Sequence, residues 1–186
     1  MKKMNTEEAH LARDYILTAF DDMVAKNDTR ELGKMLAMAN EHWQRDWINK
    51  NTNLKVSRRE DVEDCDNNQS GYDLLSLKPL RIQSKFRSTT LHMENTRRVS
   101  EKNRGMASSS GHVTYSCDEC DIFCITRPCG EYENVDKWEM LAIPASELAD
   151  PKRPGFLRGT IPKAIENQYR GRAKEILENA ENAACI

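Results

Sequence analysis

The chain has 186 residues, of which 38% are hydrophobic and 31% are charged, and its formal net charge at pH 7 is −2. This composition indicates one globular domain with a buried core, and the small negative charge disfavours a protein that holds DNA by charge alone. No stretch of about 18 apolar residues is present. The charged N-terminus also lacks an apolar signal segment, so we expect a cytoplasmic protein without a membrane span.

Two amphipathic helices are predicted at the start of the chain, over about 6–26 and about 30–49. Apolar residues recur along the second helix with helical spacing, and this stripe ends in Trp43 and Trp47. Glu41 lies beside the stripe, on the flank of the helix. An acid in that position is ordinarily a solvent-facing residue.

A polar strand over 53–59 and an acidic loop over 60–71 are expected next. The loop is rich in Asn, Gln, Ser and Gly after its acids, and it lacks the residue pattern of a calcium-binding loop. Glu60 and Glu63 are nevertheless candidate acids for a site, because they lie close in sequence to the hairpin that follows.

That hairpin is predicted as two short strands, over 72–77 and 80–87, separated by a Lys-Pro pair that interrupts the β pattern. The second strand alternates apolar and polar residues, so Gln83 and Lys85 share one face. Asp73, near the start of the first strand, is thereby placed beside an amide oxygen and an ammonium group. Such a combination suits one hard cation and one water molecule.

The segment after the hairpin is basic, since seven lysines and arginines lie between positions 81 and 104 against two glutamates. A basic segment directly after the proposed site could follow a DNA backbone. Its candidate contacts are Arg87, Arg97, Arg98 and Lys102. A solvated charged surface explains the same composition equally well.

The rest of the chain predicts a helix over about 89–101, a strand within 112–127 and a last strand over 137–144. Prolines and glycines indicate a loop over 150–159, and a single C-terminal helix is expected to begin at Pro162.

Cys117, Cys120, Cys124 and Cys129 form the strongest competing signal, because four thiolates at short spacing can hold zinc. The later cysteines overlap an apolar strand, however, and alternation there puts Cys120, Ile122 and Cys124 on one buried face. Free cysteine packs as a small hydrophobic residue, so core packing is the simpler explanation. A zinc-stabilised interaction module without catalytic function stays an alternative.

Asp73, followed by nine residues and then Gln83-Ser84-Lys85, resembles the signature of the PD-(D/E)xK nucleases, with glutamine at the position of the second acid. The segment IPASEL over 143–148 is similar to the sequence after the last strands of related endonucleases. The resemblance covers roughly 32–148. It implies an α/β fold in which helices flank the central mixed β-sheet of this nuclease type, with an N-terminal helical pair and a C-terminal helix.

The resemblance also implies Mg²⁺-dependent hydrolysis of a phosphodiester. Asp73 would be the main ligand of the metal, Gln83 would add a side-chain oxygen, and Lys85 would orient or activate the attacking water. In this family a glutamate on the helix before the sheet often points at the metal, which makes Glu41 the first candidate for an auxiliary acid. Glutamine supplies only a neutral oxygen, so we expect weaker metal binding than a carboxylate would give.

We interpret the chain as one nuclease domain over 1–186, with a helical extension over 1–30, a catalytic core over 31–150 and a C-terminal loop and helix over 151–186. No sequence-reading module is recognisable. The chain is therefore most similar to the small subunit of a heterodimeric Type IIS restriction endonuclease. In such an enzyme a large subunit reads the site and nicks one strand of double-stranded DNA. This chain, a monomer when alone, would cut the other strand. A self-sufficient homodimeric nuclease of the resolvase or repair type is the alternative enzyme.

Overall fold

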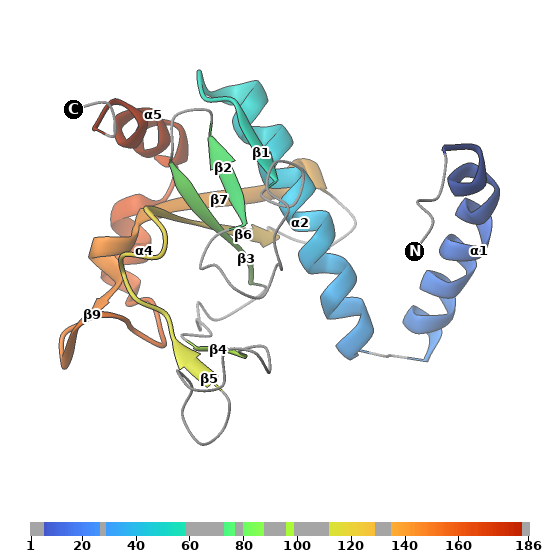
Figure 1. Cartoon of the computed structure of the whole chain (residues 1–186), viewed down its shortest axis with the longest axis horizontal. Coiled ribbons are helices and arrows are strands. Elements are labelled where there is room, and N and C mark those ends of the chain that lie inside the picture. Colours follow the sequence, from blue (N-terminus) through green and yellow to red (C-terminus); the bar gives the residue numbers. More distant parts are fainter. Residues whose placement is uncertain are drawn as a thin grey trace. The chain divides into compact units, whose positions relative to one another are not determined.

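The structure is a computed structural model, which describes residues 6–26, 29–58, 73–76, 80–87, 96–98, 112–128 and 135–183. The chain divides into two compact units, Met1–Ala39 and Asn40–Ile186. The two predicted N-terminal helices are confirmed as α1 (Thr6–Ala25) and α2 (Thr29–Asn51), and α2 continues from the first unit into the second (Figure 1). No helix in the described ranges combines the length and the apolar character that crossing a membrane requires.

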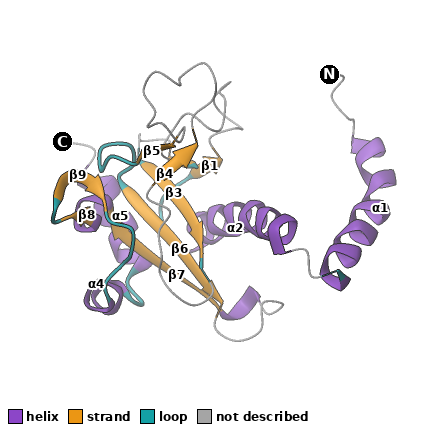
Figure 2. Ribbon diagram, turned by 90° about the horizontal axis from the view of Figure 1, so that it is seen from below, coloured by secondary structure: helices purple, strands orange, loops and turns teal. Residues whose placement is uncertain are grey.

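The second unit is built on a five-stranded mixed sheet in the order β1-β2-β3-β6-β7. Figure 2 shows β3, β6 and β7 side by side in this sheet. Its strands are β1 (Val56–Arg58), β2 (Leu74–Ser76), β3 (Arg81–Phe86), β6 (Ile122–Pro128) and β7 (Trp138–Pro144). β3 and β6 are parallel, and the other neighbouring strands are antiparallel. The predicted α/β class and the predicted antiparallel hairpin of β2 and β3 are therefore confirmed.

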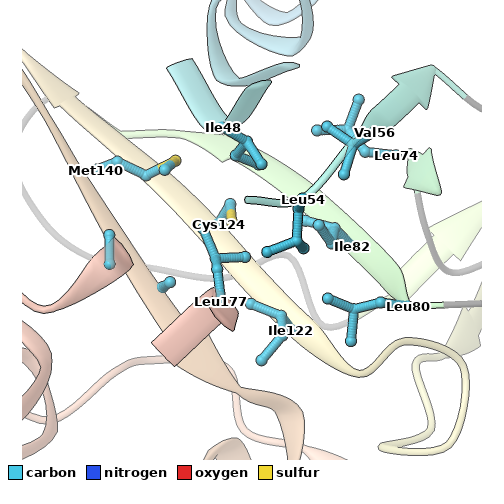
Figure 3. Packing of buried hydrophobic residues seen from close by; sticks show 12 residues of the cluster. Ile48, Leu54, Val56, Leu74, Leu80, Ile82, Ile122, Cys124, Met140 and Leu177 are labelled. Carbon is cyan, nitrogen blue, oxygen red and sulfur yellow. The ribbon is translucent and has the colours of Figure 1, made fainter. Parts of the chain in front are cut away.

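One face of the sheet is covered by α2 and by α5 (Ala173–Ala183), which enclose a core of buried side chains (Figure 3). Ile48 of α2 and Leu177 of α5 pack there against Leu74, Ile82 and Cys124 of the strands. Each buried leucine or isoleucine stabilises the fold by about 1.5–3 kcal/mol. This core anchors the second half of α2 to the sheet.

The opposite face of β6 and β7 is covered by α4 (Lys163–Tyr169), by the 3-10 helix η3 (Ala145–Leu148) and by the small sheet of β8 (Ala149–Asp150) and β9 (Arg153–Leu157). A second cluster of buried side chains fills this side. Its members include Phe123, Ile125, Leu141, Ile143, Leu148, Leu157, Ile161 and Tyr169. A further 3-10 helix, η2 (Val135–Lys137), leads into β7.

The helix predicted over 89–101 is wrong where the structure describes that segment. Thr96–Arg98 form β4, which pairs antiparallel with β5 (His112–Thr114). The rest of 89–101 lies outside the described residues. A polar segment has a weak local preference, so the strand at 112–114 with which it pairs decides its conformation.

Two further predictions are corrected after β7. The expected loop over 150–159 contains β9, which pairs antiparallel with β8 around a turn and includes Gly155 at a φ of 88°. The expected single C-terminal helix is interrupted, because Gly171 adopts a φ of 71° between α4 and α5. Only glycine adopts a positive φ without a steric penalty. The apolar periodicity continues on both sides of Gly171, so the sequence pattern predicts one uninterrupted helix.

Candidate active site

The candidate site lies where β2 begins and β3 continues past it. β2 pairs with β3 from Leu74 opposite Ile82, and β3 runs on to Phe86. Asp73 precedes β2 at this point, and its Oδ2 accepts a hydrogen bond from the backbone N–H of Ser84 at 2.8 Å. The carboxylate is thereby held against the edge of β3, as the predicted hairpin required.

Gln83 contacts Asp73 directly. The side chain is buried, with 3% of the residue exposed, and its Nε2 donates to Asp73 Oδ2 and to the Ser84 carbonyl. Its Oε1 is buried and has no hydrogen-bond partner among the described residues. A buried amide oxygen without a donor costs about 1–3 kcal/mol. A cation that accepted this oxygen as a ligand would remove that cost.

Glu41 of α2 is a second acid of the candidate site. Its carboxylate lies 3.7 Å from Nε of Arg58, whose Nη1 is 2.7 Å from Nε2 of His42. The pKa of Glu41 is raised from 4.5 to about 7, chiefly by burial and then by the negative charge of Asp73, while the positive charges of Arg58 and Lys85 partly oppose the rise. Glu41, Asp73 and Lys85 are therefore close enough to interact electrostatically.

Lys85 lies two residues beyond Gln83 on β3, so both side chains emerge on the same face of the sheet. Its Nζ is 5.7 Å from the centre of the Tyr115 ring, at a distance where a cation is attracted to an aromatic face. Tyr115 packs on the cluster that contains Phe123. The ring thus holds the ammonium group on the face that Gln83 shares.

Two residues of α2 that the sequence did not single out position the end of β3. Asn40 donates from Nδ2 to Ser84 Oγ at 2.7 Å. The amide of Gln44 donates to the Cys124 carbonyl at 3.0 Å and to Thr126 Oγ1 at 2.8 Å, and more weakly to the Lys85 carbonyl at 3.4 Å. Both side chains are almost completely buried.

The predicted stripe residues Trp43 and Trp47 do pack against the core, but the most buried face of α2 lies beside them and is largely polar. The residues of α2 that are fully buried against the sheet are Asn40, Gln44 and Ile48, while Trp43 and Trp47 are only partly buried. Because residues 40 and 44 are polar, the sequence pattern predicts that this face of the helix is exposed to solvent. The one sequence feature that indicates the buried face is the spacing of Asn40, Gln44 and Ile48 at intervals of four residues, which places the three on one side of a helix.

The other candidate residues have varied placements. Arg87 is half-buried, and its Nη1 donates to the Phe86 carbonyl at 2.7 Å. Arg97 and Arg98 lie in β4, and their side chains are outside the described set. Positions 60, 63 and 102, which hold the two alternative acids and the candidate lysine, also lie outside the described residues.

Cysteine packing favours the core over a zinc site. Cys120 and Cys124 are buried, and burial raises the pKa of each thiol, which disfavours the thiolate that zinc requires. Cys124 packs in the cluster with Ile122, but Cys120 packs in the other cluster, so the predicted common face is wrong for Cys120. β6 begins only at Ile122, and alternation does not extend backwards beyond the strand. Cys129 lies outside the described residues.

The residues present can be weighed as ligands for a divalent cation. Within the described ranges, no three His, Cys, Asp or Glu side chains form a group that suits a metal ion. The candidate donors are instead two carboxylates, from Asp73 and Glu41, and the partnerless amide oxygen of Gln83. All are oxygen donors, which Mg²⁺ prefers, and Mg²⁺ commonly completes its shell with water. The donor chemistry fits Mg²⁺.

No protein-family model matches this chain, and no curated protein matches it. No match therefore identifies a nuclease fold. Function is inferred from the residues gathered at the end of β3.

Glu41 provides a test of this electrostatic arrangement. Between pH 4.5 and 7 the folded protein holds more protons at this carboxyl than the unfolded chain, so the free energy of unfolding falls as pH rises. In Glu41→Gln this loss is absent. We expect the variant to be more stable than the wild type at pH 8 by about 3 kcal/mol without added metal, and similar to it at pH 4. Urea unfolding at the two pH values measures the difference. An equal effect at both would contradict the perturbed carboxyl.

Proposed function

We propose that this chain is a Mg²⁺-dependent endonuclease subunit of the PD-(D/E)xK type, which hydrolyses a phosphodiester in one strand of double-stranded DNA. The supporting observation is that Asp73 is hydrogen-bonded to Gln83 and to the Ser84 N–H, with Lys85 on the same face of β3 as Gln83. Glu41 interacts electrostatically with both Asp73 and Lys85. An acid, an amide oxygen, an amine and a second acid are the groups that this chemistry needs.

Asp73, Glu41 and Oε1 of Gln83 would hold the cation. When bound, Mg²⁺ polarises the phosphate and neutralises the charge that develops on its oxygens. The backbone N–H of Ser84 keeps the Asp73 carboxylate at the strand edge, and Arg58 keeps Glu41 near it. These contacts set the ligand positions before any substrate arrives, which lowers the cost of ordering them.

Lys85 would act on the water and on the phosphate. Its ammonium group donates hydrogen bonds and carries a positive charge, so it orients the attacking water and stabilises the negative charge of the transition state. The bond from the water oxygen to phosphorus forms as the bond from phosphorus to the leaving sugar oxygen breaks. The contact with the Tyr115 ring limits the positions that the long side chain can occupy.

Sequence recognition is assigned to a larger partner subunit, as in a heterodimeric Type IIS restriction endonuclease. The net charge of −2 supports this assignment, because affinity for DNA comes largely from cations that neutralise phosphates. The chain is proposed to be a monomer when alone and to cut the strand that the partner does not cut.

A plasmid nicking assay tests the proposal. We expect the full chain to convert supercoiled plasmid into open circles when Mg²⁺ and a candidate large subunit are both present, and to be inactive with Ca²⁺ or EDTA. Nicking by the chain alone would instead support the self-sufficient homodimeric nuclease. Absence of metal-dependent nicking under every condition would exclude a nuclease.

A further inference from the structure

Asn40 of α2 is a buried amide that reaches the strand on which the candidate active site is built. It is 1% exposed, and its Nδ2 donates at 2.7 Å to Oγ of Ser84, which is 7% exposed. Ser84 stands between Gln83 and Lys85 on β3, so its side chain points to the other face of the sheet, where α2 packs. Asn40 therefore contacts β3 from the face opposite to the candidate catalytic side chains.

Ser84 connects this contact to Asp73. The backbone N–H of Ser84 donates to Asp73 Oδ2 at 2.8 Å, and the backbone N–H of Asp73 donates to the Ile82 carbonyl at 2.8 Å. The position of the Asp73 carboxylate thus follows the position of the β3 backbone at Ser84. Because Asn40 holds the side chain of Ser84, it restrains β3 at the residue that sets the carboxylate.

The helix that carries Asn40 is anchored by contacts with β6 and with the core. Gln44 follows Asn40 by about one turn of α2. It donates to the Cys124 carbonyl at 3.0 Å and to Thr126 Oγ1 at 2.8 Å, both of which belong to β6. Ile48, about one turn further on, is completely buried in the core. These contacts fix α2 on the sheet, so Asn40 is a firm support for Ser84.

Asn40 is a poor choice of residue for stability alone. Its Oδ1 is buried and has no hydrogen-bond partner in the part of the chain that the structure describes. A buried polar atom without a partner carries a desolvation cost, which an apolar side chain of similar shape would avoid. Asn49 of the same helix differs, since its Nδ2 donates to the Val56 carbonyl at 3.0 Å and its Oδ1 accepts from the Val56 N–H at 2.8 Å. Residues that break a packing rule in this way are expected at functional sites.

We propose that Asn40 is a positioning residue of the candidate metal site, which fixes the Asp73 carboxylate through Ser84 and thereby raises the affinity of the site for Mg²⁺. This inference rests on the proposed function, because it takes Asp73 as the main ligand of the cation. A ligand that is already oriented loses less conformational freedom when the metal binds. Residues that orient metal ligands typically contribute about tenfold to a hundredfold to metal affinity. Asn40 acts through a second residue, so its effect belongs at the lower end of that range.

Calorimetric titration of the full chain with Mg²⁺ alone tests this role, together with urea unfolding in the absence of metal. We expect Asn40→Leu to bind Mg²⁺ about tenfold more weakly and to change the urea midpoint little, because the substitution also removes the buried amide oxygen that lacks a partner. Asn49→Leu is the matched control from the same helix. It breaks both hydrogen bonds to Val56, so it should lower the urea midpoint and leave the Mg²⁺ affinity unchanged.

Ser84→Ala tests the same contact from the other side. If Asn40 acts through Ser84 Oγ, loss of this hydroxyl weakens Mg²⁺ binding by about as much as Asn40→Leu does. The double variant Asn40→Leu/Ser84→Ala then binds Mg²⁺ no more weakly than either single variant. Additive losses in the double variant would overturn the proposal, because Asn40 would then act by another route. Wild-type Mg²⁺ affinity in Asn40→Leu would overturn it as well.

Titration of Asp73→Ala with Mg²⁺ separates a failure of this proposal from a failure of the proposed function. If Asp73→Ala no longer binds Mg²⁺ and Asn40→Leu binds it like the wild type, the metal site stands and only the positioning role fails. If the wild-type chain does not bind Mg²⁺, or binds it equally well without the Asp73 carboxylate, the metal site of the proposed function fails and the positioning role fails with it.

Discussion

Asp73→Ala is expected to lower the rate of plasmid nicking at least about a thousandfold, because the substitution removes the main ligand of the cation and the charge stabilisation that the cation supplies. The carboxylate contributes little apolar packing. Its loss removes the acceptor of the Ser84 N–H and one of the two acceptors of the Gln83 amide, which costs about 1–3 kcal/mol of stability. We therefore expect a folded but inactive protein.

The measurement compares initial nicking rates over a Mg²⁺ titration, with circular dichroism to verify the fold. Asp118→Ala is a suitable control, since Asp118 is an exposed acid in the turn before β6 and should be dispensable. Asp73→Asn refines the test, because it keeps the shape but removes the charge. A fully active Asp73→Ala variant with unchanged Mg²⁺ dependence would remove the catalytic assignment of this residue.

Lys85→Met is expected to slow nicking by about a hundredfold to a thousandfold, the usual loss when one group that stabilises transition-state charge is deleted. Methionine preserves the apolar stem of the side chain and can still pack on the Tyr115 ring. The fold and the binding of duplex DNA should therefore be retained, so the loss should appear in the maximal rate more than in the DNA concentration that gives half of it.

Lys174→Met controls for the removal of a positive charge, because Lys174 is exposed on α5. Lys85→Arg is informative as well. A guanidinium group keeps the charge but has a planar donor geometry and a different reach, so it should restore little of the activity. Wild-type nicking by Lys85→Met would show that the amine has no part in the reaction.

The hairpin of β2 and β3 was predictable because its signal is local. Alternation along β3 determines which residues share a face, and the register of a short hairpin follows from its length. The local sequence of the hairpin is therefore sufficient to place Asp73 opposite Gln83. The break at Gly171 and the strand at Thr96–Arg98 were not predicted, since one depends on a single backbone angle and the other on a distant partner strand.

The burial and the contacts of the α2 residues around the hairpin could not be predicted from the sequence. Glu41 was selected by resemblance, but its burial and its interaction with Asp73 exist only because α2 packs on the sheet. Asn40 and Gln44 were missed because a polar residue inside a helix gives no sign of being buried. Their hydrogen bonds reach residues 41 to 82 positions away in sequence.

The sequence alone determined the α/β class, the two N-terminal helices and the strand pair that aligns Asp73 with Gln83, because helix and strand periodicities are encoded by near neighbours. Tertiary structure decided the rest. It turned the polar side of α2 toward the sheet, separated Cys120 from Cys124, and brought Arg127 to Glu166 across 39 positions of sequence. Such contacts depend on which surfaces pack together, and the local sequence pattern does not determine that packing.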